Sequence, residues 1–131
     1  MEKLYVIDTH ALLWYVSADS RLGKNAQRIF EKAEIGDVVV LVPTIVLAEV
    51  MHILEKHELE KTYTEILKKI DSSLNFVVVS FDYRVLKVAR DIKTIAEIHD
   101  RIIVATAKIT SAQILTRDKN ISKSKWVETI W

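Results

Sequence analysis

The chain has 131 residues, of which 50% are hydrophobic and 28% are charged, and this composition excludes a disordered protein. Its 19 basic and 18 acidic side chains leave a formal net charge of +1, so no global charge marks it as a nucleic-acid binder. It has no cysteine and only two glycines, which excludes disulfide scaffolds, thiolate metal centres, cysteine catalysis and glycine-rich phosphate-binding loops.

The first half of the chain predicts strands that alternate with helices. Residues 4–7 form a short apolar run that indicates a strand, and apolar residues at helical spacing follow it. A helix is expected over residues 26–33, a second strand over 38–42, and another helix over 44–54. The strand segments contain no polar residues in alternation, which is typical of strands covered on both faces of a parallel sheet.

The second half repeats this alternation. Apolar residues at helical spacing predict a helix over residues 59–70, and the run at 76–79 predicts a third strand. Helices are expected over 82–89 and over 100–109, the latter buried because it is apolar almost all round. A short fourth strand is expected at 114–115. Thr44 and Asp82 are suitable N-cap residues for their helices.

This order of elements predicts an α/β protein: a single domain over residues 1–131, built as a three-layer α/β/α sandwich around a central, mostly parallel sheet. No apolar run approaches the roughly 20 residues of a membrane span, and the apolar stretch near the N-terminus is too short for a signal peptide. We therefore expect a cytoplasmic protein without a membrane partner.

Four acidic residues are expected to meet at one edge of this sheet. Asp8 ends the first strand, and Asp118 follows the fourth strand. Asp100 opens the buried helix that leads into the fourth strand, and Glu49 lies on the helix that follows the second strand. In open parallel sheets, ligands bind beyond the carboxyl ends of the strands.

Four carboxylates at one edge repel one another unless a cation lies between them. Oxygen ligands without thiolates or paired histidines suit Mg²⁺ or Mn²⁺, which bind phosphate groups and activate water. Taken singly, each acid has a simpler interpretation as a turn former, a helix cap or a solvated side chain.

Four segments together resemble the PIN-domain family, especially the VapC-type toxins of prokaryotic toxin–antitoxin pairs. They are IDTHALLW at residues 7–14, PTIVLAE at 43–49, HDRIIVATA at 99–107 and LTRD at 115–118. The resemblance extends from Tyr5 to the last predicted strand, and the first segment is its most specific part.

The resemblance implies a metal-dependent endoribonuclease that uses Mg²⁺ or Mn²⁺. Its catalytic acids correspond to Asp8, Glu49, Asp100 and Asp118. Asp8, Asp100 and Asp118 would bind the metal, with the hydroxyl of Thr116 nearby. Glu97 stands where the family usually has an aspartate, and we place it among the supporting residues.

Five basic residues near these acids are candidates for binding RNA: Arg101, Arg117, Lys119, Lys123 and Lys125. The resemblance also implies a small antitoxin partner and a homodimer formed through helices, for which Trp14 and Phe30 are candidate exposed interface residues. Two alternatives remain open. The first is a catalytically silent PIN-like module that binds protein or RNA, and the second is an RNA-processing nuclease that is not a toxin.

Overall fold

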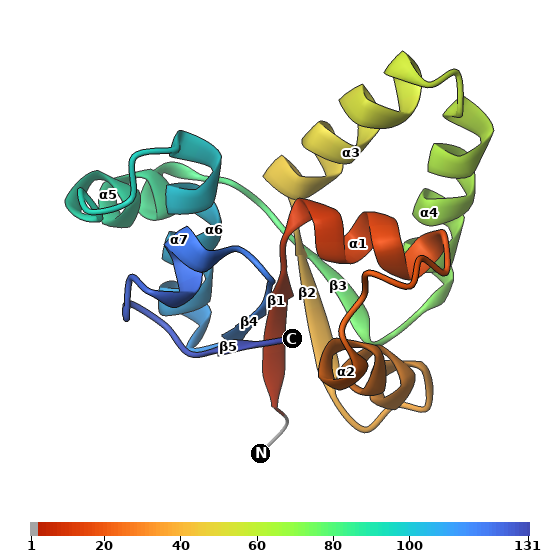
Figure 1. Ribbon diagram of the computed structural model, residues 1–131, viewed down its shortest axis with the longest axis horizontal. Helices are drawn as coiled ribbons and strands as arrows, with labels where there is room; N and C mark the ends of the chain where they lie inside the picture. The colour runs from red at the N-terminus through yellow and green to blue at the C-terminus, as the bar shows by residue number, and fades with distance from the viewer. Residues whose placement is uncertain (1–2) are drawn as a thin grey trace.

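The computed structural model describes residues 3–131 (Figure 1). Its elements follow in the order β1 (Leu4–Ile7), α1 (Thr9–Val16), α2 (Lys24–Glu34), β2 (Val39–Pro43), α3 (Thr44–Lys56), α4 (Glu60–Ser72), β3 (Phe76–Val79), α5 (Tyr83–Asp91), α6 (Ile98–Thr110), β4 (Gln113–Leu115), α7 (Lys119–Ser122) and β5 (Thr129–Ile130).

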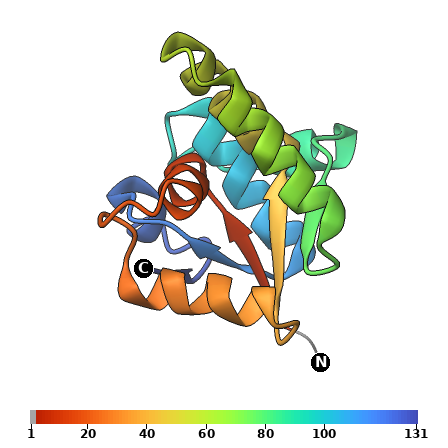
Figure 2. The same cartoon turned by 90° about the vertical axis from the view of Figure 1, so that its right-hand side faces the viewer.

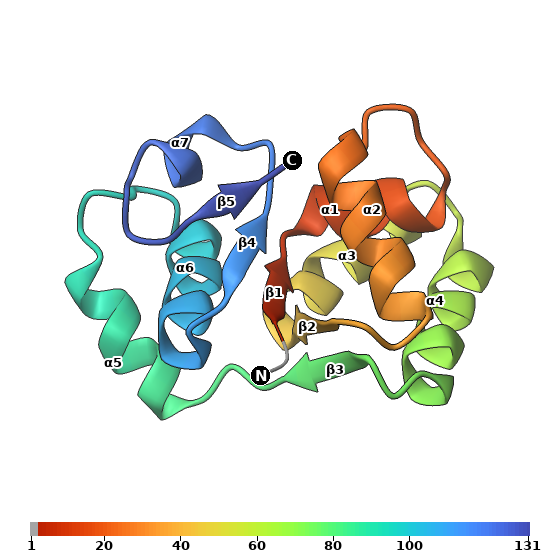
Figure 3. The same cartoon turned by 90° about the horizontal axis from the view of Figure 1, so that it is seen from below.

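The strands form one five-stranded sheet in the order β3-β2-β1-β4-β5, and every pair is parallel. The central strand β1 places Tyr5 opposite Val40 of β2 and Val6 opposite Ile114 of β4. Figure 3 shows α5 and α6 on one side of the sheet and α1, α2 and α4 on the other. The expected α/β fold with a central parallel sheet is therefore confirmed.

Helix α2 shows how the helices on one side of the sheet pack together. Its buried residues recur at helical spacing and include Phe30, which is fully buried. The Phe30 ring stacks on Tyr15 of α1 with centroids 4.0 Å apart, and burying a side chain of this size contributes about 1.5–3 kcal/mol. Because Phe30 and Trp14 both lie in the interior, the expectation that they are exposed at an interface is wrong.

One of the two expected N-caps is correct. The Asp82 carboxylate accepts a hydrogen bond from the Val85 N–H at 3.0 Å and caps α5, as predicted. Thr44 is instead the first residue of α3, and Pro43 occupies the cap position. The Thr44 hydroxyl accepts a hydrogen bond from the Phe81 N–H at 3.0 Å, so it holds the segment after β3 against α3.

Two strands differ from the sequence prediction. Strand β3 lies at the edge of the sheet, and Val77 and Val78 are 41% and 43% exposed, so it is not covered on both faces. Strand β5 was not expected, because two residues are too few to produce a recognisable pattern.

The parallel arrangement brings the starts of α1, α3 and α6 to the same end of the molecule, where β1 and β2 finish (Figure 1). Asp8 immediately precedes α1 and Asp100 lies in the first turn of α6, whereas Glu49 lies in the middle of α3. Among residues 3–131, no helix is both long enough and apolar enough to cross a membrane.

Candidate functional site

Asp8 is held at the carboxyl end of β1 by two hydrogen bonds. Its Oδ1 accepts from the Ala11 N–H at 2.9 Å, which makes Asp8 the N-cap of α1, and its Oδ2 accepts from the Thr116 hydroxyl. The residue is only 8% exposed. Burial raises the pKa of Asp8 above its ordinary value, although these two hydrogen bonds oppose the rise.

Thr116 joins the ends of the neighbouring strands β1 and β4. While its hydroxyl donates to Asp8, it accepts a hydrogen bond from the Asp118 N–H at 3.0 Å. A hydroxyl group can do both at once, since it has one donor hydrogen and two lone pairs. Thr116 therefore fixes the positions of both aspartates relative to each other.

Asp118 has a structural role in addition to its place at the site. Its Oδ1 accepts from the N–H groups of Asn120 and Ile121, at 2.7 and 3.3 Å, and so caps the short helix α7. The turn chemistry recognised in the sequence is real, and it holds the carboxylate at the edge where Asp8 lies.

Asp100 lies in the first turn of α6 but does not open that helix as expected. The helix begins at Ile98, and Glu97 caps it by accepting a hydrogen bond from the Asp100 N–H at 2.8 Å. The pKa of Asp100 is raised to about 7, first by partial burial and then by the negative charges of Asp118, Glu97, Asp8 and Glu49.

Glu49 reaches the site from the middle of α3. Its Oε1 accepts a hydrogen bond from the Thr9 hydroxyl at 3.0 Å, and its Oε2 lies 4.0 Å from Nδ1 of His99. The same His99 nitrogen lies 2.8 Å from Oε1 of Glu97. His99 thus stands between two carboxylates, and in its protonated form it would pair with them.

These side chains share one hollow, which we call the acidic cavity. It has a volume of about 510 Å³, and five carboxylates line it: Asp8, Glu49, Glu97, Asp100 and Asp118. The structure therefore brings together the four acids singled out in the sequence, and Glu97 joins them.

The acidic cavity fits a hard divalent cation in its chemistry. All of its acidic donors are oxygen atoms, and the pKa of Asp100 is raised first by partial burial and then by neighbouring negative charges, which a cation would offset. Within residues 3–131, however, no three histidine, aspartate or glutamate side chains are close enough together to hold an ion by themselves. Mg²⁺ can be bound without three direct protein ligands, because it is commonly held by one or two carboxylates and keeps several waters.

The five basic candidates are spread over several places. Arg117 lines the acidic cavity, and its guanidinium lies 4.6 Å from the centroid of the Trp14 ring. Lys119 is exposed on α7. Lys125 lines a separate hollow that contains none of the five acids, so the expected cluster does not include it. Lys123 lines a further hollow, together with Glu97 and Asp100.

Arg101 is engaged within the fold. It was a candidate for binding RNA, but its Nε donates a hydrogen bond to the backbone carbonyl of Ile95. This bond ties α6 to the loop before it.

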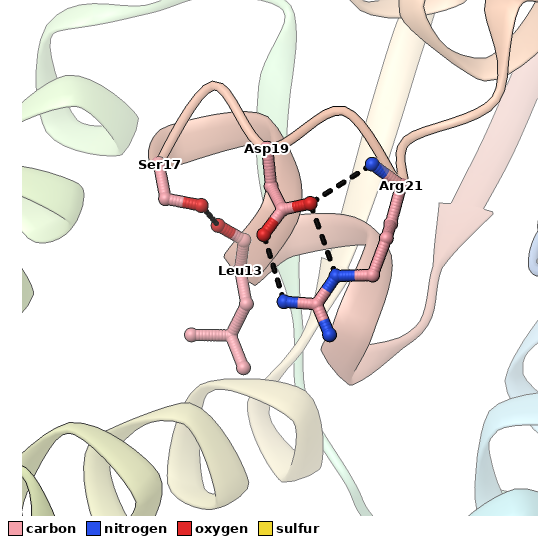
Figure 4. A network of polar contacts seen from close by, with 4 residues as sticks. All are labelled: Leu13, Ser17, Asp19 and Arg21. Atoms are coloured by element: carbon pink, nitrogen blue, oxygen red, sulfur yellow. Dashed lines mark hydrogen bonds and ion pairs between the residues drawn. The ribbon is translucent and has the colours of Figure 1, made fainter.

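Arg21 is a basic residue of the acidic cavity that sequence reasoning missed. It lies in the loop between α1 and α2, where its Nη2 pairs with Oδ2 of Asp19 at 2.7 Å (Figure 4). Its guanidinium also lies 4.7 Å from the centroid of the Trp14 ring. No local pattern marks Arg21, because only the path of this loop brings it to the site.

Comparisons with known proteins agree with this architecture. The PIN-domain family model matches residues 5–126. No match was found among curated proteins.

Several solved structures share the fold at low sequence identity. VapBC2 from Rickettsia felis, bound to a promoter DNA fragment, has a TM-score of 0.75 and 15% identity, with 97% of each chain covered. VapC20 from Mycobacterium tuberculosis, described as a toxin that cleaves the sarcin–ricin loop, has a TM-score of 0.73 and 17% identity, covering 95% of this chain and 97% of that one. FitAcB from Neisseria gonorrhoeae has a TM-score of 0.70 and 18% identity, covering 97% and 96%.

Proposed function

The chain belongs to the PIN-domain family, and we propose that it is an endoribonuclease that hydrolyses RNA with the aid of Mg²⁺ or Mn²⁺. The observation that carries this proposal is the convergence of five carboxylates, from segments far apart in the sequence, on one cavity. The similarity in fold to VapC20, which is described as a toxin that cleaves the sarcin–ricin loop, supports the choice of RNA as the substrate.

Asp8, Asp100 and Asp118 are the residues we propose to hold the cation, directly or through water. When bound, such an ion would neutralise the crowded carboxylates, bind a phosphate oxygen and lower the pKa of a coordinated water. Thr116 and Glu97 are positioning residues in this proposal. Thr116 fixes the Asp8 carboxylate by a hydrogen bond, and Glu97 fixes the first turn of α6, from which Asp100 projects.

Glu49 is the residue we propose to orient the attacking water. It approaches from α3, and its hydrogen bond from Thr9 leaves Oε2 on the side of His99. In the reaction the water oxygen bonds to phosphorus while the bond from phosphorus to the 3′ oxygen breaks. The 3′ oxygen leaves with a proton, and the products are a 5′-phosphate and a 3′-hydroxyl.

Replacing Asp8 by asparagine tests this function. Asp8→Asn keeps the shape of the side chain but removes its charge, so we expect RNA cleavage to fall by more than the roughly 10–100-fold typical of lost outer-shell partners. The melting temperature should stay level or rise, because burial disfavours the charged form of Asp8.

Asp71→Asn, on the exposed surface of α4, is the matched control and should cleave RNA like the parent protein. Full activity in Asp8→Asn, or in the parent protein with excess EDTA, would contradict the proposal.

We further propose that the protein is the toxin of a toxin–antitoxin pair and acts as a homodimer. The similarity in fold to VapBC2 and FitAcB supports a small protein partner for this chain. A short open reading frame next to the gene should then encode a partner that co-purifies with the chain and inhibits cleavage. If no neighbouring product does so, an RNA-processing role outside such a pair is the better interpretation.

A catalytically silent PIN module is the second candidate function. The observation in its favour is that, among the described residues, no three acidic or histidine side chains are arranged to hold an ion unaided. Measuring stability with and without Mn²⁺ separates the two candidates, because only a protein that binds the cation gains stability from it.

A further inference from the structure

The acidic cavity is one half of a longer cleft. A second hollow of about 530 Å³ adjoins it, and both are lined by Glu97 and Asp100. The second hollow, which we call the lysine cavity, is also lined by Thr94, Asn120 and Lys123. Asp100 therefore lies at the junction of two cavities, with room for a ligand on either side.

The wall of the acidic cavity carries two guanidinium groups on a fixed aromatic ring. Arg21 and Arg117 lie 4.7 and 4.6 Å from the centroid of the Trp14 ring. Trp14 is only 7% exposed and packs edge-on against Trp131 at 5.7 Å, so the ring is held in place. Arg117 forms no ion pair with any residue in the described range 3–131, which leaves its charge available to a ligand.

The lysine cavity carries one cation beside polar groups. Lys123 is exposed there and makes no ion pair with the residues that the structure describes. The wall next to it is fixed, because the Thr94 hydroxyl accepts a hydrogen bond from the indole N–H of Trp126 at 2.8 Å. Asn120 adds a side-chain amide, which can both donate and accept hydrogen bonds.

This distribution of charge suits a flexible polyanion. A nucleic-acid strand repeats its phosphates along its length, so a strand with one phosphate beside Asp100 would carry further phosphates into both cavities. The carboxylates in the centre repel those neighbouring phosphates, whereas Arg117 on one side and Lys123 on the other attract them. A single strand can bend to follow such a cleft, whereas a duplex is too stiff to do so.

We infer that single-stranded RNA lies across the start of α6 and occupies both cavities. Arg117 would bind a phosphate on one side of the scissile bond, and Lys123 would bind a phosphate on the other side. Arg21 lines the wall beside Arg117, but its guanidinium is paired with Asp19. This inference rests on the proposed nuclease function, and it retains Arg117 and Lys123 while leaving out Arg101 and Lys125.

Binding measured without cleavage tests this inference. In an Asp8→Asn background, fluorescence anisotropy would follow a labelled single-stranded RNA of about 12 nucleotides, a length within the range such grooves occupy. We expect Arg117→Gln and Lys123→Gln each to weaken binding several-fold. Each should also reduce the slope of log K against log salt by about 0.7, the value for one phosphate contact on a single strand.

Matched controls carry the same change in charge away from the cleft. Arg90→Gln on α5 and Lys61→Gln on α4 remove exposed cations that line neither cavity. They should leave affinity and salt slope close to those of the parent. If the cleft variants behave like these controls, or if duplex RNA binds more tightly than the single strand, the inference is wrong.

The two proposals fail in distinguishable ways. If the parent protein never cleaves RNA but Arg117→Gln and Lys123→Gln weaken binding as expected, the catalytic function fails and the cleft inference stands. If the parent protein cleaves RNA and both variants bind it undiminished, only the cleft inference fails.

Discussion

The carboxyl group of Asp100 titrates near neutrality because of what surrounds it. Partial burial removes water that would stabilise its charge, and four other carboxylates add repulsion. Its pKa of about 7 lies well above the ordinary value of 3.8 for an aspartate, so the folded protein holds this proton more tightly than the unfolded chain does. The contribution to stability is therefore fully present below about pH 4 and is lost as the pH rises through 7.

Asp100→Asn should remove this loss of stability at rising pH. Without divalent cations, the parent protein should become less stable relative to the variant between about pH 5 and pH 8, by on the order of 1 kcal/mol after allowing for solvent screening at a half-buried site. Thermal unfolding across this pH range, in the presence of EDTA, measures the difference.

Asp71→Asn again serves as the control, and its stability should change with pH in the same way as that of the parent protein. Parallel curves for Asp100→Asn as well would show that its carboxyl group titrates normally.

Residues such as Asp8 and Asp118 could be placed from the sequence because strand ends are visible as the ends of apolar runs. Arg21 could not, since its position depends on the path of the loop between two helices. The hydrogen bonds within the site were equally hidden. That Glu97, rather than Asp100, caps α6 depends on where the helix begins, and sequence patterns fix helix boundaries poorly.

The contact between Gly23 and Trp131 holds the start of α2 to the end of β5 (Figure 2). A Cβ atom on Gly23 would lie 2.4 Å from the backbone carbonyl carbon of Trp131 and 2.6 Å from its ring. Gly23 has a φ of −65°, which any residue adopts, so close approach rather than backbone conformation requires glycine here.

Gly23→Ala should therefore destabilise the protein by about 1–3 kcal/mol, the usual cost of overpacking. It should also shift the tryptophan fluorescence, because Trp131 must move and it packs against Trp14. Chemical denaturation followed by fluorescence measures both effects.

Gly36→Ala is the comparison. Gly36 has a positive φ of 87° and open space around it, so alanine there should cost stability without changing the folded-state emission. If Gly23→Ala leaves stability and emission unchanged, the inference that Trp131 packs closely against Gly23 is wrong.

At the level of elements, long periodic segments were predictable and short or marginal ones were not. The apolar face of α2 can be recognised in the sequence because apolar residues recur at helical spacing along it. Elements α7 and β5 are too short to show any periodic pattern. Strand β3 looked like a covered strand because its valines are the same residues that buried strands use. Its edge position follows from the order of pairing, which local composition does not encode.

The molecule as a whole places its crowded acids where a cation would stabilise the folded state. If the acidic cavity binds Mn²⁺, the melting temperature should rise with the Mn²⁺ concentration. At 100 times the dissociation constant, the free energy of unfolding should increase by about 2.7 kcal/mol. The gain should be larger at about pH 8 than at about pH 6, because protons compete for Asp100. Differential scanning calorimetry in a Mn²⁺ series measures this.

Asp8→Asn should lose most of the Mn²⁺ effect, and Asp71→Asn should keep it. If the melting temperature of the parent protein does not change with Mn²⁺ at either pH, the silent module is favoured over the nuclease.

The architecture was predictable because an alternation of apolar runs and amphipathic segments permits few arrangements other than a layered parallel sheet. That prediction also located the site in outline, since parallel strands finish at one edge. The two cavities could not be predicted from the sequence, because the volume left between α1, α6 and α7 depends on how their side chains pack.

The bond from Thr116 to Asp8 joins residues 108 positions apart. During synthesis, the segment that supplies β1 leaves the ribosome early, but its partner in β4 follows only when most of the chain has been made. A nascent or prematurely terminated chain therefore lacks Thr116, one of the two groups that hold the Asp8 carboxylate, and it would have no assembled centre. Under the proposed function, a cell that makes this nuclease is exposed to its activity only after translation is nearly complete.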